Sequence, residues 1–390
     1  MARAPYIDRQ SFLAEAERIA GADDWGDDGF EEAFNRFVDA LNTEAELTPE
    51  GVERTRSHIL KLLVGRLRLF ADRKTYPDIA KEEVRTPLVV TGLGRSGTSY
   101  LNALIAADER NHAPLHWQVW SPSPPPRLPG ADIRPSIEAG ERCIAVEGWQ
   151  DPEVRKTHDY TAFNASEDTF MEEYSFCVGS FGFFWNVPSF SAWLSGTDLS
   201  PGYRVQRKLM QALQYGDKRD QWVVKGPLHV GQLSYLFGEF PDARVIVTHR
   251  DPVKSLASIT SMLIAHRLQF GNPAPEVGRE DLLNVMEGNV RRVEDMLRHR
   301  EDPAVDRQFV DVGYLDLERD PLGQVAKVYT HHGLDFTPDA RTAMERYVAE
   351  NRKGKHGAHK YDIREMGLSV EEVRERFRFY TDQYDIPYEA

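Results

Sequence analysis

Residues 87–106 read PLVVTGLGRSGTSYLNALIA, and the pattern of side chains changes twice within this short stretch. A β-branched run ends at Thr91, a glycine-rich turn occupies residues 92–99, and apolar residues in a helical pattern follow. This order is typical of the opening of a βαβ unit. The glycines let the backbone curl so that successive N–H groups and a helix N-terminus face one anion. The stretch therefore predicts an α/β fold with a turn that binds a phosphate or sulfate group.

Two later segments repeat the pattern of a strand followed by a turn. Residues 221–225 read QWVVK before Gly-Pro, residues 243–249 read ARVIVTH before Arg-Asp-Pro, and a further strand is expected at residues 308–312. Continuous apolar strands that alternate with helices indicate a parallel sheet covered on both faces, with ligands beyond the carboxyl ends of the strands. We expect a P-loop-like parallel sheet flanked by helices.

Helical patterns precede this sheet. The clearest of these patterns places apolar residues between Phe30 and Leu41 on one face, and a second begins where Thr48 offers a hydroxyl cap and Pro49 a first-turn proline. We expect residues 1–85 to form an N-terminal helical extension packed on an α/β domain of residues 86–390. Within that domain, residues 112–220 are rich in loops and aromatic side chains and supply no obvious strand, so we expect them to form an acceptor-binding insertion.

The composition of the chain excludes several classes of function. The 390 residues include 48 Lys and Arg against 62 Asp and Glu, a net charge of −14. A chain this acidic is repelled by nucleic acid and by anionic membranes unless its cations are gathered in one place. No apolar run is long enough to span a membrane and no secretory signal opens the sequence, so we expect a cytoplasmic protein. A homo-oligomer is left open. Cys143 and Cys177 are expected to be free thiols, with no zinc or iron–sulfur site.

The glycine-rich turn matches two common motifs. Gly92, Gly94 and Gly97 spell the dinucleotide pattern GxGxxG, and Gly92 and Gly97 also have the spacing of a P-loop. A nucleoside triphosphatase needs a lysine after Gly97, where this chain has Thr98. A dinucleotide enzyme needs an acidic residue about 20 positions further on, whereas residues 112–118 read HAPLHWQ. A NAD(P)-binding oxidoreductase and a nucleotide-binding protein without catalysis stay open as alternatives.

A third interpretation accounts for the whole turn. It resembles the 5′-phosphosulfate loop of sulfotransferases that use 3′-phosphoadenosine 5′-phosphosulfate (PAPS), in which Lys or Arg followed by Ser-Gly-Thr-Thr/Ser grips the 5′-phosphate. The arginine at this position is closer to the bacterial branch of the family. The resemblance implies PAPS as sulfuryl donor and its bisphosphate (PAP) as product. The implied donor-binding residues are Arg95, Ser96, Gly97, Thr98 and Ser99.

Two further segments resemble the family's 3′-phosphate site. Arg250 at an expected strand end and Ser258 eight residues later match the arginine and serine of that site. A guanidinium fork and a nearby hydroxyl suit a phosphate dianion. Arg352, Lys353 and Gly354 resemble the family's RKGxxG segment, which folds over the same phosphate.

Two supporting matches extend the resemblance over residues 86–385. Lys225 lies in a stretch similar to the family strand that delivers a second cation to the leaving group. Tyr314 lies in a stretch similar to one whose tyrosine approaches adenine. Cations near the leaving oxygen stabilise its developing charge, and Arg95 can supply charge but no proton because guanidinium stays protonated. We therefore predict that Arg95 and Lys225 take part in catalysis and that no metal is required.

The catalytic base is predicted from its distance along the chain from the glycine-rich turn. Related enzymes with an arginine-type loop carry a catalytic glutamate about one helix beyond it, and this region of the chain contains His116. Histidine has a suitable ordinary pKa for a base near neutral pH. We predict His116 as the base, with Glu167 as the alternative and with Asp168 and His158 in reserve.

The acceptor is inferred from the aromatic residues of the insertion. Residues 181–203 read FGFFWNVPSFSAWLSGTDLSPGY. Most of these side chains are expected in a core, yet so many rings beside nucleotide-binding strands would also favour an apolar pocket. We expect a small hydrophobic acceptor with a hydroxyl group, such as a lipid, isoprenoid, sterol or phenol, and not a polyanionic glycan.

Overall fold

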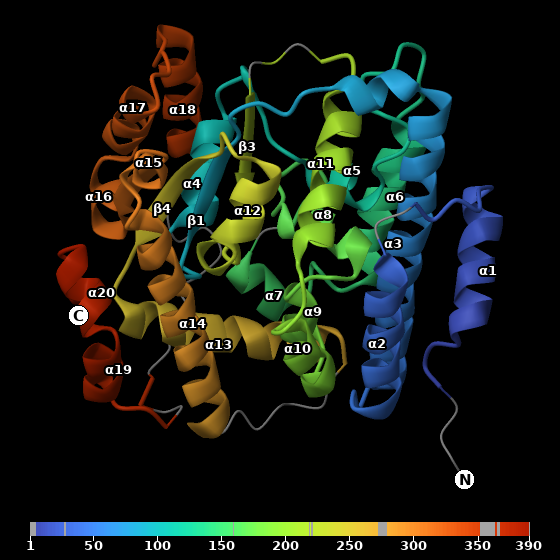
Figure 1. The fold of residues 1–390 in the computed structure, drawn as a ribbon, viewed down its shortest axis with the longest axis horizontal. Helices are drawn as coiled ribbons and strands as arrows, with labels where there is room; N and C mark the ends of the chain where they lie inside the picture. The colour runs from blue at the N-terminus through green and yellow to red at the C-terminus, as the bar shows by residue number, and fades with distance from the viewer. Residues whose placement is uncertain are drawn as a thin grey trace. The chain divides into compact units, whose positions relative to one another are not determined.

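The described residues of the computed structural model form helices and one parallel sheet (Figure 1). The residues that the structure describes are 5–26, 29–158, 160–217, 219, 221–271, 279–351, 363–364 and 367–389. The chain divides into two compact units: unit 1 comprises residues 1–84, 114–218 and 263–275, and unit 2 comprises residues 85–113, 219–262 and 276–390. None of the helices in these described ranges has the length and apolar character needed to cross a membrane.

Unit 2 contains the sheet, whose five strands are parallel and lie in the order β2-β3-β1-β4-β5. The strands are β1 (Leu88–Gly92), β2 (Asn111–His112), β3 (Gln221–Lys225), β4 (Arg244–His249) and β5 (Phe309–Gly313). The four longer strands and their parallel arrangement confirm the sequence prediction. β2 was not predicted, because a strand of two residues carries no periodic pattern.

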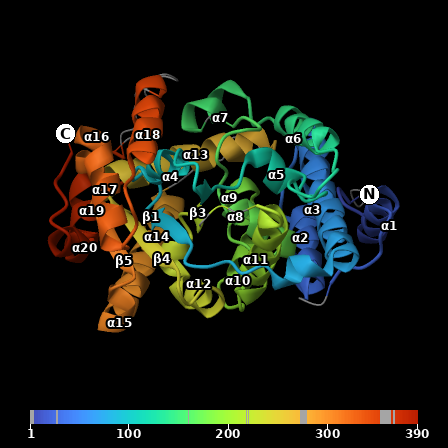
Figure 2. The same cartoon turned by 90° about the horizontal axis from the view of Figure 1, so that it is seen from above.

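Both faces of β1 are buried, which explains its unbroken apolar sequence. Leu88 and Val90 share one hydrophobic cluster with α4 (Thr98–Ala106), α17 (Pro321–His331) and α18 (Pro338–Glu350), so these helices cover one face of the sheet (Figure 2). The other elements of unit 2 are η3 (His229–Gly231), α12 (Leu233–Glu239), α14 (Arg279–Arg300), α15 (Pro303–Asp306), α16 (Tyr314–Arg319), α19 (Val370–Arg376) and α20 (Arg378–Gln383). Helix α13 (Pro252–Gln269) begins in unit 2, and its last residues belong to unit 1.

Unit 1 is helical. Its elements are α1 (Arg9–Ala20), α2 (Phe30–Thr43), α3 (Pro49–Thr75), η1 (Pro77–Lys81), α5 (His116–Trp120), α6 (Arg134–Val146), α7 (Pro152–Thr157), α8 (Thr169–Glu172), η2 (Glu173–Ser175), α9 (Ser180–Phe184), α10 (Pro188–Leu194) and α11 (Ser200–Gln214). As predicted, Thr48 caps α3, because its hydroxyl accepts a hydrogen bond of 3.1 Å from the backbone N–H of Gly51. The N-terminal helices belong to the same unit as residues 114–218.

The aromatic stretch at residues 181–203 helps to build the core of unit 1. Phe37 of α2 stacks on Phe181 with ring centroids 4.3 Å apart, and its ring lies 5.3 Å from those of both Trp185 and Phe190. All four side chains are buried. Large aromatic side chains contribute much of the apolar area that stabilises a core. The packing accounts for these rings without a ligand.

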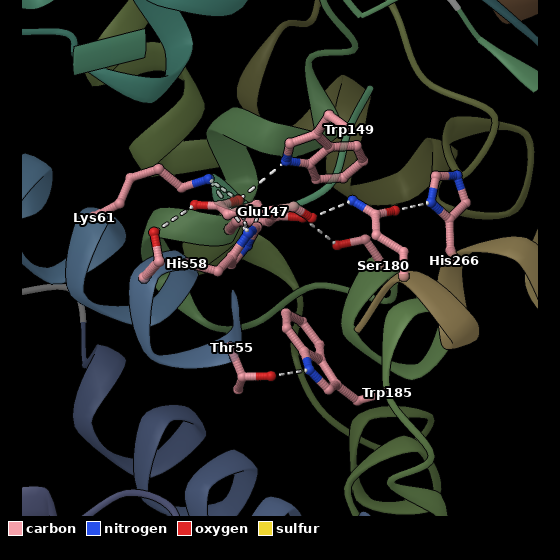
Figure 3. Close-up of polar contacts among 11 residues, drawn as sticks. Thr55, His58, Lys61, Glu147, Trp149, Ser180, Trp185 and His266 are labelled. Carbon is pink, nitrogen blue, oxygen red and sulfur yellow. Dashed lines mark hydrogen bonds and ion pairs between the residues drawn. The ribbon is translucent and has the colours of Figure 1, made fainter. Parts of the chain in front are cut away.

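A buried network of charged side chains also lies in unit 1 (Figure 3). The Glu147 carboxylate lies 2.9 Å from Nδ1 of His58 and accepts hydrogen bonds from Lys61 Nζ at 2.8 Å and Trp149 Nε1 at 3.0 Å. The other ring nitrogen of His58 lies 2.9 Å from Oε2 of Glu173. Neither carboxylate reaches solvent, so each depends on these partners.

The positive and negative side chains of this network stabilise one another in their charged forms. Burial alone would raise the pKa of Glu147, but Lys61 and His58 lower it to about 2. Burial and Lys61 disfavour protonation of His58, yet the carboxylates of Glu147 and Glu173 together raise its pKa above the ordinary 6.5. The two carboxylates therefore favour the protonated form of His58.

Candidate functional site

The glycine-rich turn between β1 and α4 requires glycine at its two ends. Gly92 has φ +143° and Gly97 has φ +94°, a backbone region that L side chains rarely adopt. A Cβ atom at Gly92 would also lie 2.5 Å from the carbonyl oxygen of Thr248 on β4. The turn can pass this close to the neighbouring strand only because a hydrogen stands where other residues carry Cβ.

Ser96 holds the turn from inside. Its side chain is fully buried, and its hydroxyl donates a hydrogen bond of 2.6 Å to the carbonyl of Leu93. The same oxygen lies 2.5 Å from Oγ1 of Thr248, which in turn contacts the carbonyl of Thr91 at 3.3 Å. The hydroxyl of Ser96 therefore stabilises the shape of the loop. The expected contact of this residue with a nucleotide stays a prediction.

Thr98 and Ser99 form the first turn of α4. Gly97 is the N-cap residue, and no described side chain caps the helix. The first backbone N–H groups of a helix have no partner within the helix, and together with the helix dipole they favour an anion at this end. The sequence prediction of an anion-binding turn thus coincides with a strand–turn–helix geometry of the expected kind.

Arg250 lies directly after β4 and meets residues from two other segments. Its Nη1 donates a hydrogen bond of 2.8 Å to the backbone carbonyl of Arg95 in the glycine-rich turn. Its guanidinium carbon lies 3.9 Å from the centroid of the Tyr314 ring, at the start of α16. Stacking of this kind is favourable for a guanidinium group. Three residues that were predicted from separate sequence motifs therefore converge.

Ser258, in the second turn of α13, is also part of this group of residues. Nε of Arg95 donates a hydrogen bond of 3.1 Å to its hydroxyl oxygen. Tyr314 packs on the turn itself, since a Cβ atom at Gly97 would lie 3.2 Å from its ring. We call Arg95, Arg250, Ser258 and Tyr314 the arginine cluster, and all four residues belong to unit 2.

An acidic residue that was not predicted from the sequence lies next to the arginine cluster. Nε and Nη2 of Arg250 donate hydrogen bonds of 2.7 and 2.9 Å to the two carboxylate oxygens of Glu389. The two residues are separated by 139 positions, and no motif connects them. Burial alone would lower the pKa of Arg250, but Glu389 and Tyr314 raise it, so the guanidinium carries its full charge.

Lys225 ends β3, next to the strand that leads into the turn. It pairs in register with Val90 of β1, and its side chain is buried. The following residue, Gly226, donates its N–H to the carbonyl of Val90 at 3.2 Å and accepts a hydrogen bond of 2.9 Å from the Thr91 hydroxyl. Lys225 thus lies at the carboxyl edge of the sheet, where parallel α/β folds bind ligands.

His249 fixes the end of β4, and its role was also missed from the sequence. Its Nε2 lies 2.8 Å from Asp311 and its Nδ1 lies 2.9 Å from the hydroxyl of Tyr380. Burial lowers the pKa of His249, and Asp311 offsets this only in part. A neutral ring that donates to Asp311 and accepts from Tyr380 satisfies both contacts. The only sequence signal was its position directly before Arg250.

A second anchor holds Asp311 in place. Arg300 donates hydrogen bonds of 2.7 and 2.9 Å to its two carboxylate oxygens. Burial would raise the pKa of Asp311, but the hydrogen bonds from His249 and Arg300 hold it well below its usual range. The charged pair therefore stabilises the position of His249, and through it the backbone that carries Arg250.

The remaining predicted donor residues lie outside the described residues. They are Arg352, Lys353 and Gly354.

The predicted base belongs to unit 1. His116 is buried, and its ring stacks on Trp120 with centroids 5.0 Å apart, beside Tyr160 at 5.2 Å and Phe170 at 6.3 Å. The alternative, Glu167, is partly exposed in the same unit. The assignment of the base to either residue stays a prediction.

The chain is similar to known proteins over most of its length. The sequence model of the sulfotransferase family matches residues 87–338, a range that includes the glycine-rich turn, Lys225 and the arginine cluster. A relative from Mycobacterium bovis, named omega-hydroxy-beta-dihydromenaquinone-9 sulfotransferase Stf3, is 22% identical over 313 residues, or 75% of each chain.

Two crystal structures are similar to the whole chain. The sulfotransferase STF1 from Mycobacterium tuberculosis superposes with a TM-score of 0.82 at 31% identity, covering 96% of this chain and 99% of that one. The sulfotransferase STF9 from Mycobacterium avium superposes with a TM-score of 0.84 at 26% identity, covering 98% of both chains. These similarities agree with the fold class that the sequence predicted.

Proposed function

Because this chain belongs to the sulfotransferase family, we propose that it transfers the sulfuryl group of PAPS to a hydroxyl group of a small hydrophobic molecule. The observation that carries the proposal is the arginine cluster, in which Arg95, Arg250 and Ser258 gather two cations and a hydroxyl beside an anion-binding turn. The net charge of the chain is −14, so a local group of cations favours one compact anion over extended polyanions.

The residues of the arginine cluster fit the chemistry of a nucleotide with two phosphate positions. The guanidinium of Arg250 can bind a phosphate through two parallel N–H donors, and Ser258 can add a hydroxyl donor. The backbone N–H groups of residues 97–99 and the N-terminus of α4 suit the 5′-phosphate. The ring of Tyr314, which already stacks on a planar guanidinium, offers a flat apolar surface for adenine.

Catalysis would divide among three side chains. When bound, PAPS supplies an activated sulfuryl group, which passes to the acceptor oxygen as the bond between sulfur and the phosphate oxygen breaks. Arg95 and Lys225 would stabilise the charge on that phosphate oxygen. Because these two side chains would already supply positive charge beside the leaving oxygen, we propose that no metal takes part. His116, or Glu167 in its place, would accept the proton of the acceptor hydroxyl.

A hydrophobic alcohol or phenol is the acceptor class that we propose. The Mycobacterium bovis relative is named for a hydroxylated menaquinone, a hydrophobic molecule, although only 22% of the aligned residues are identical. The aromatic stretch at residues 181–203 does not add to this argument, because Phe181, Trp185 and Phe190 fill the core of unit 1. The acceptor class therefore rests on the named substrate of the relative and on the net charge of −14, which disfavours binding of a polyanionic acceptor.

Incubation of the purified protein with radiolabelled PAPS and a panel of acceptors tests the proposal. The panel would contain a hydroxylated menaquinone, an isoprenoid alcohol, a sterol, a simple phenol and an anionic polysaccharide. We expect label in one of the hydrophobic alcohols or phenols. Transfer to the polysaccharide alone would overturn the acceptor class, and PAP binding without transfer to any acceptor would favour a non-catalytic protein. Binding of NAD(P) in preference to PAP would overturn the donor.

A further inference from the structure

Glu389 occupies the part of the arginine cluster that the proposed function assigns to a phosphate group. We propose that Glu389 is a displaceable competitor for the 3′-phosphate of the donor, so that a nucleotide gains access to Arg250 only by carrying a 3′-phosphate. The inference rests on the proposed function, because it takes Arg250 as the 3′-phosphate subsite. It adds a residue that tunes the affinity for the donor and that lies in no recognised sequence motif.

The geometry of the contact is that of a bound oxyanion. Nε and Nη2 of Arg250 donate to the two oxygens of Glu389 at 2.7 and 2.9 Å, which is the side-on arrangement by which arginine also binds phosphate. Nη1 is engaged with the carbonyl of Arg95 at 2.8 Å, and Tyr314 covers a face of the guanidinium. A phosphate that used Nε and Nη2 would therefore have to replace Glu389.

Glu389 is held in this position by its backbone as well as by its side chain. Its N–H donates a hydrogen bond of 2.9 Å to Oδ2 of Asp251, while Oδ1 of Asp251 accepts from the N–H of Val253 at the start of α13. The side chains of Arg250 and Glu389 are only 20% and 15% exposed. Ion pairs that are shielded from water and bidentate are stronger than surface pairs, so the contact is a real barrier to an incoming anion.

Charge decides which anions can displace the carboxylate. A glutamate carries one negative charge, whereas a phosphate monoester carries about 1.5 to 2 at neutral pH and has three acceptor oxygens. A 3′-phosphate can also use the Ser258 hydroxyl, which lies 3.1 Å from Nε of Arg95. A nucleotide that lacks the 3′-phosphate has no group to exchange for Glu389. The glutamate would thus weaken binding of a nucleotide that carries a 3′-phosphate while leaving the binding of 5′-nucleotides such as AMP unchanged.

Calorimetric titration with PAP and with AMP tests this inference on three full-length proteins: the wild type, Glu389→Gln, and Glu287→Gln as a matched control. Glu287 forms a pair of the same side-on geometry with Arg376, at 2.8 and 2.9 Å, in the same unit. For Glu389→Gln we expect PAP to bind about tenfold more tightly, equivalent to about 1.4 kcal/mol. AMP affinity should stay within about twofold of wild type, because AMP does not compete with Glu389, and Glu287→Gln should bind both ligands as wild type does.

The possible outcomes separate this inference from the proposed function. Equal PAP affinity in wild type and Glu389→Gln would overturn the inference and leave PAPS as the donor. Equal tightening of PAP and AMP would also overturn it, since removal of one negative charge would then act on any anion. Failure of PAP to bind any of the folded proteins would overturn the proposed donor and the inference with it. Thermal melting establishes folding, and Glu389→Ala serves as a second variant if the glutamine variant is unstable.

Discussion

His249, the last residue of β4, and Asp311, in the middle of the neighbouring strand β5, are joined by a hydrogen bond of 2.8 Å. Because Arg250 follows His249 directly in the chain, this bond helps to position the backbone of Arg250. We predict that Asp311→Asn lowers the free energy of unfolding by about 2 to 4 kcal/mol, since it removes the carboxylate partner of His249 and one of the two carboxylates that Arg300 contacts. It should also weaken PAP binding. Urea denaturation and calorimetry measure the two effects, with Asp382→Asn on the exposed face of α20 as a control that should change neither.

Arg250 should be sensitive even to a substitution that keeps its charge. Lysine cannot present two parallel donors to a phosphate or stack its charge on Tyr314. We predict that Arg250→Lys weakens PAP binding about 10- to 100-fold, while AMP binding changes little. Arg376→Lys removes a comparable bidentate pair with Glu287 and should leave PAP affinity unchanged. Equal loss of PAP and AMP affinity would argue against a 3′-phosphate subsite at Arg250.

Gly92 should not tolerate a methyl group. An alanine there would adopt a left-handed φ of +143° and bring Cβ within 2.5 Å of the Thr248 carbonyl. We predict that Gly92→Ala destabilises the protein by about 2 to 4 kcal/mol. Gly288 in α14 is the matched control, because nothing lies within 4 Å of its would-be Cβ. Gly288→Ala should stabilise the protein by about 0.5 to 1 kcal/mol. Chemical denaturation of both variants gives the comparison.

The buried network of unit 1 predicts a specific pH dependence of stability. His58 has a raised pKa in the folded protein, so its contribution is fully present below pH 6.5 and is lost as the pH rises through that raised value. We predict that the free energy of unfolding of His58→Gln falls less steeply above pH 6.5 than that of wild type. Denaturation curves at a series of pH values check this. Parallel curves for the two proteins would mean that His58 is not charged in the folded state.

Glu147 produces the opposite dependence at acid pH. Its pKa is about 2 in the folded protein against an ordinary 4.5, so its contribution is present above pH 4.5 and is lost as the pH falls toward 2. Glu147→Gln should therefore remove part of the acid sensitivity of wild type, at the cost of a large loss of stability at neutral pH. The same denaturation series, extended to acid pH, measures both changes.

Turnover in His116→Ala tests the predicted base. We expect transfer to be abolished while PAP affinity is retained, because a base acts on the acceptor proton and does not contact the nucleotide phosphates. Glu167→Gln is the companion variant. Near-normal turnover in His116→Ala together with loss of turnover in Glu167→Gln would assign the role to Glu167. Because His116 is buried against Trp120, the thermal stability of the variant must be measured alongside its activity.

The sheet and the arginine cluster could be predicted because their signals are local. Every position of β1 is buried, so its sequence is an unbroken apolar run, and Arg250 and Ser258 have a fixed spacing across one strand end and one helix. Glu389 could not be predicted, because its contact with Arg250 spans 139 positions and depends on the packed structure. The interaction of His249 with Asp311 was missed for the same reason.

Composition alone does not distinguish a core from a pocket. The rings at residues 181–203 were expected to serve either purpose, and the stacking of Phe181 on Phe37 identifies a core. The partner ring comes from a helix about 140 positions earlier in the chain. His58, Glu147 and Glu173 likewise form their network from three separated segments, each of which reads as an ordinary amphipathic helix or loop by itself.

Arg95 is restrained at both its backbone and its side chain. Its φ is +69°, its carbonyl accepts from Arg250, and its Nε donates to Ser258. A flexible loop would lose conformational entropy at the moment of binding, and that loss would weaken its affinity for a ligand. Here most of the ordering has already taken place during folding. The guanidinium of Arg95 is thus preorganised, and a ligand that binds it does not have to order the turn.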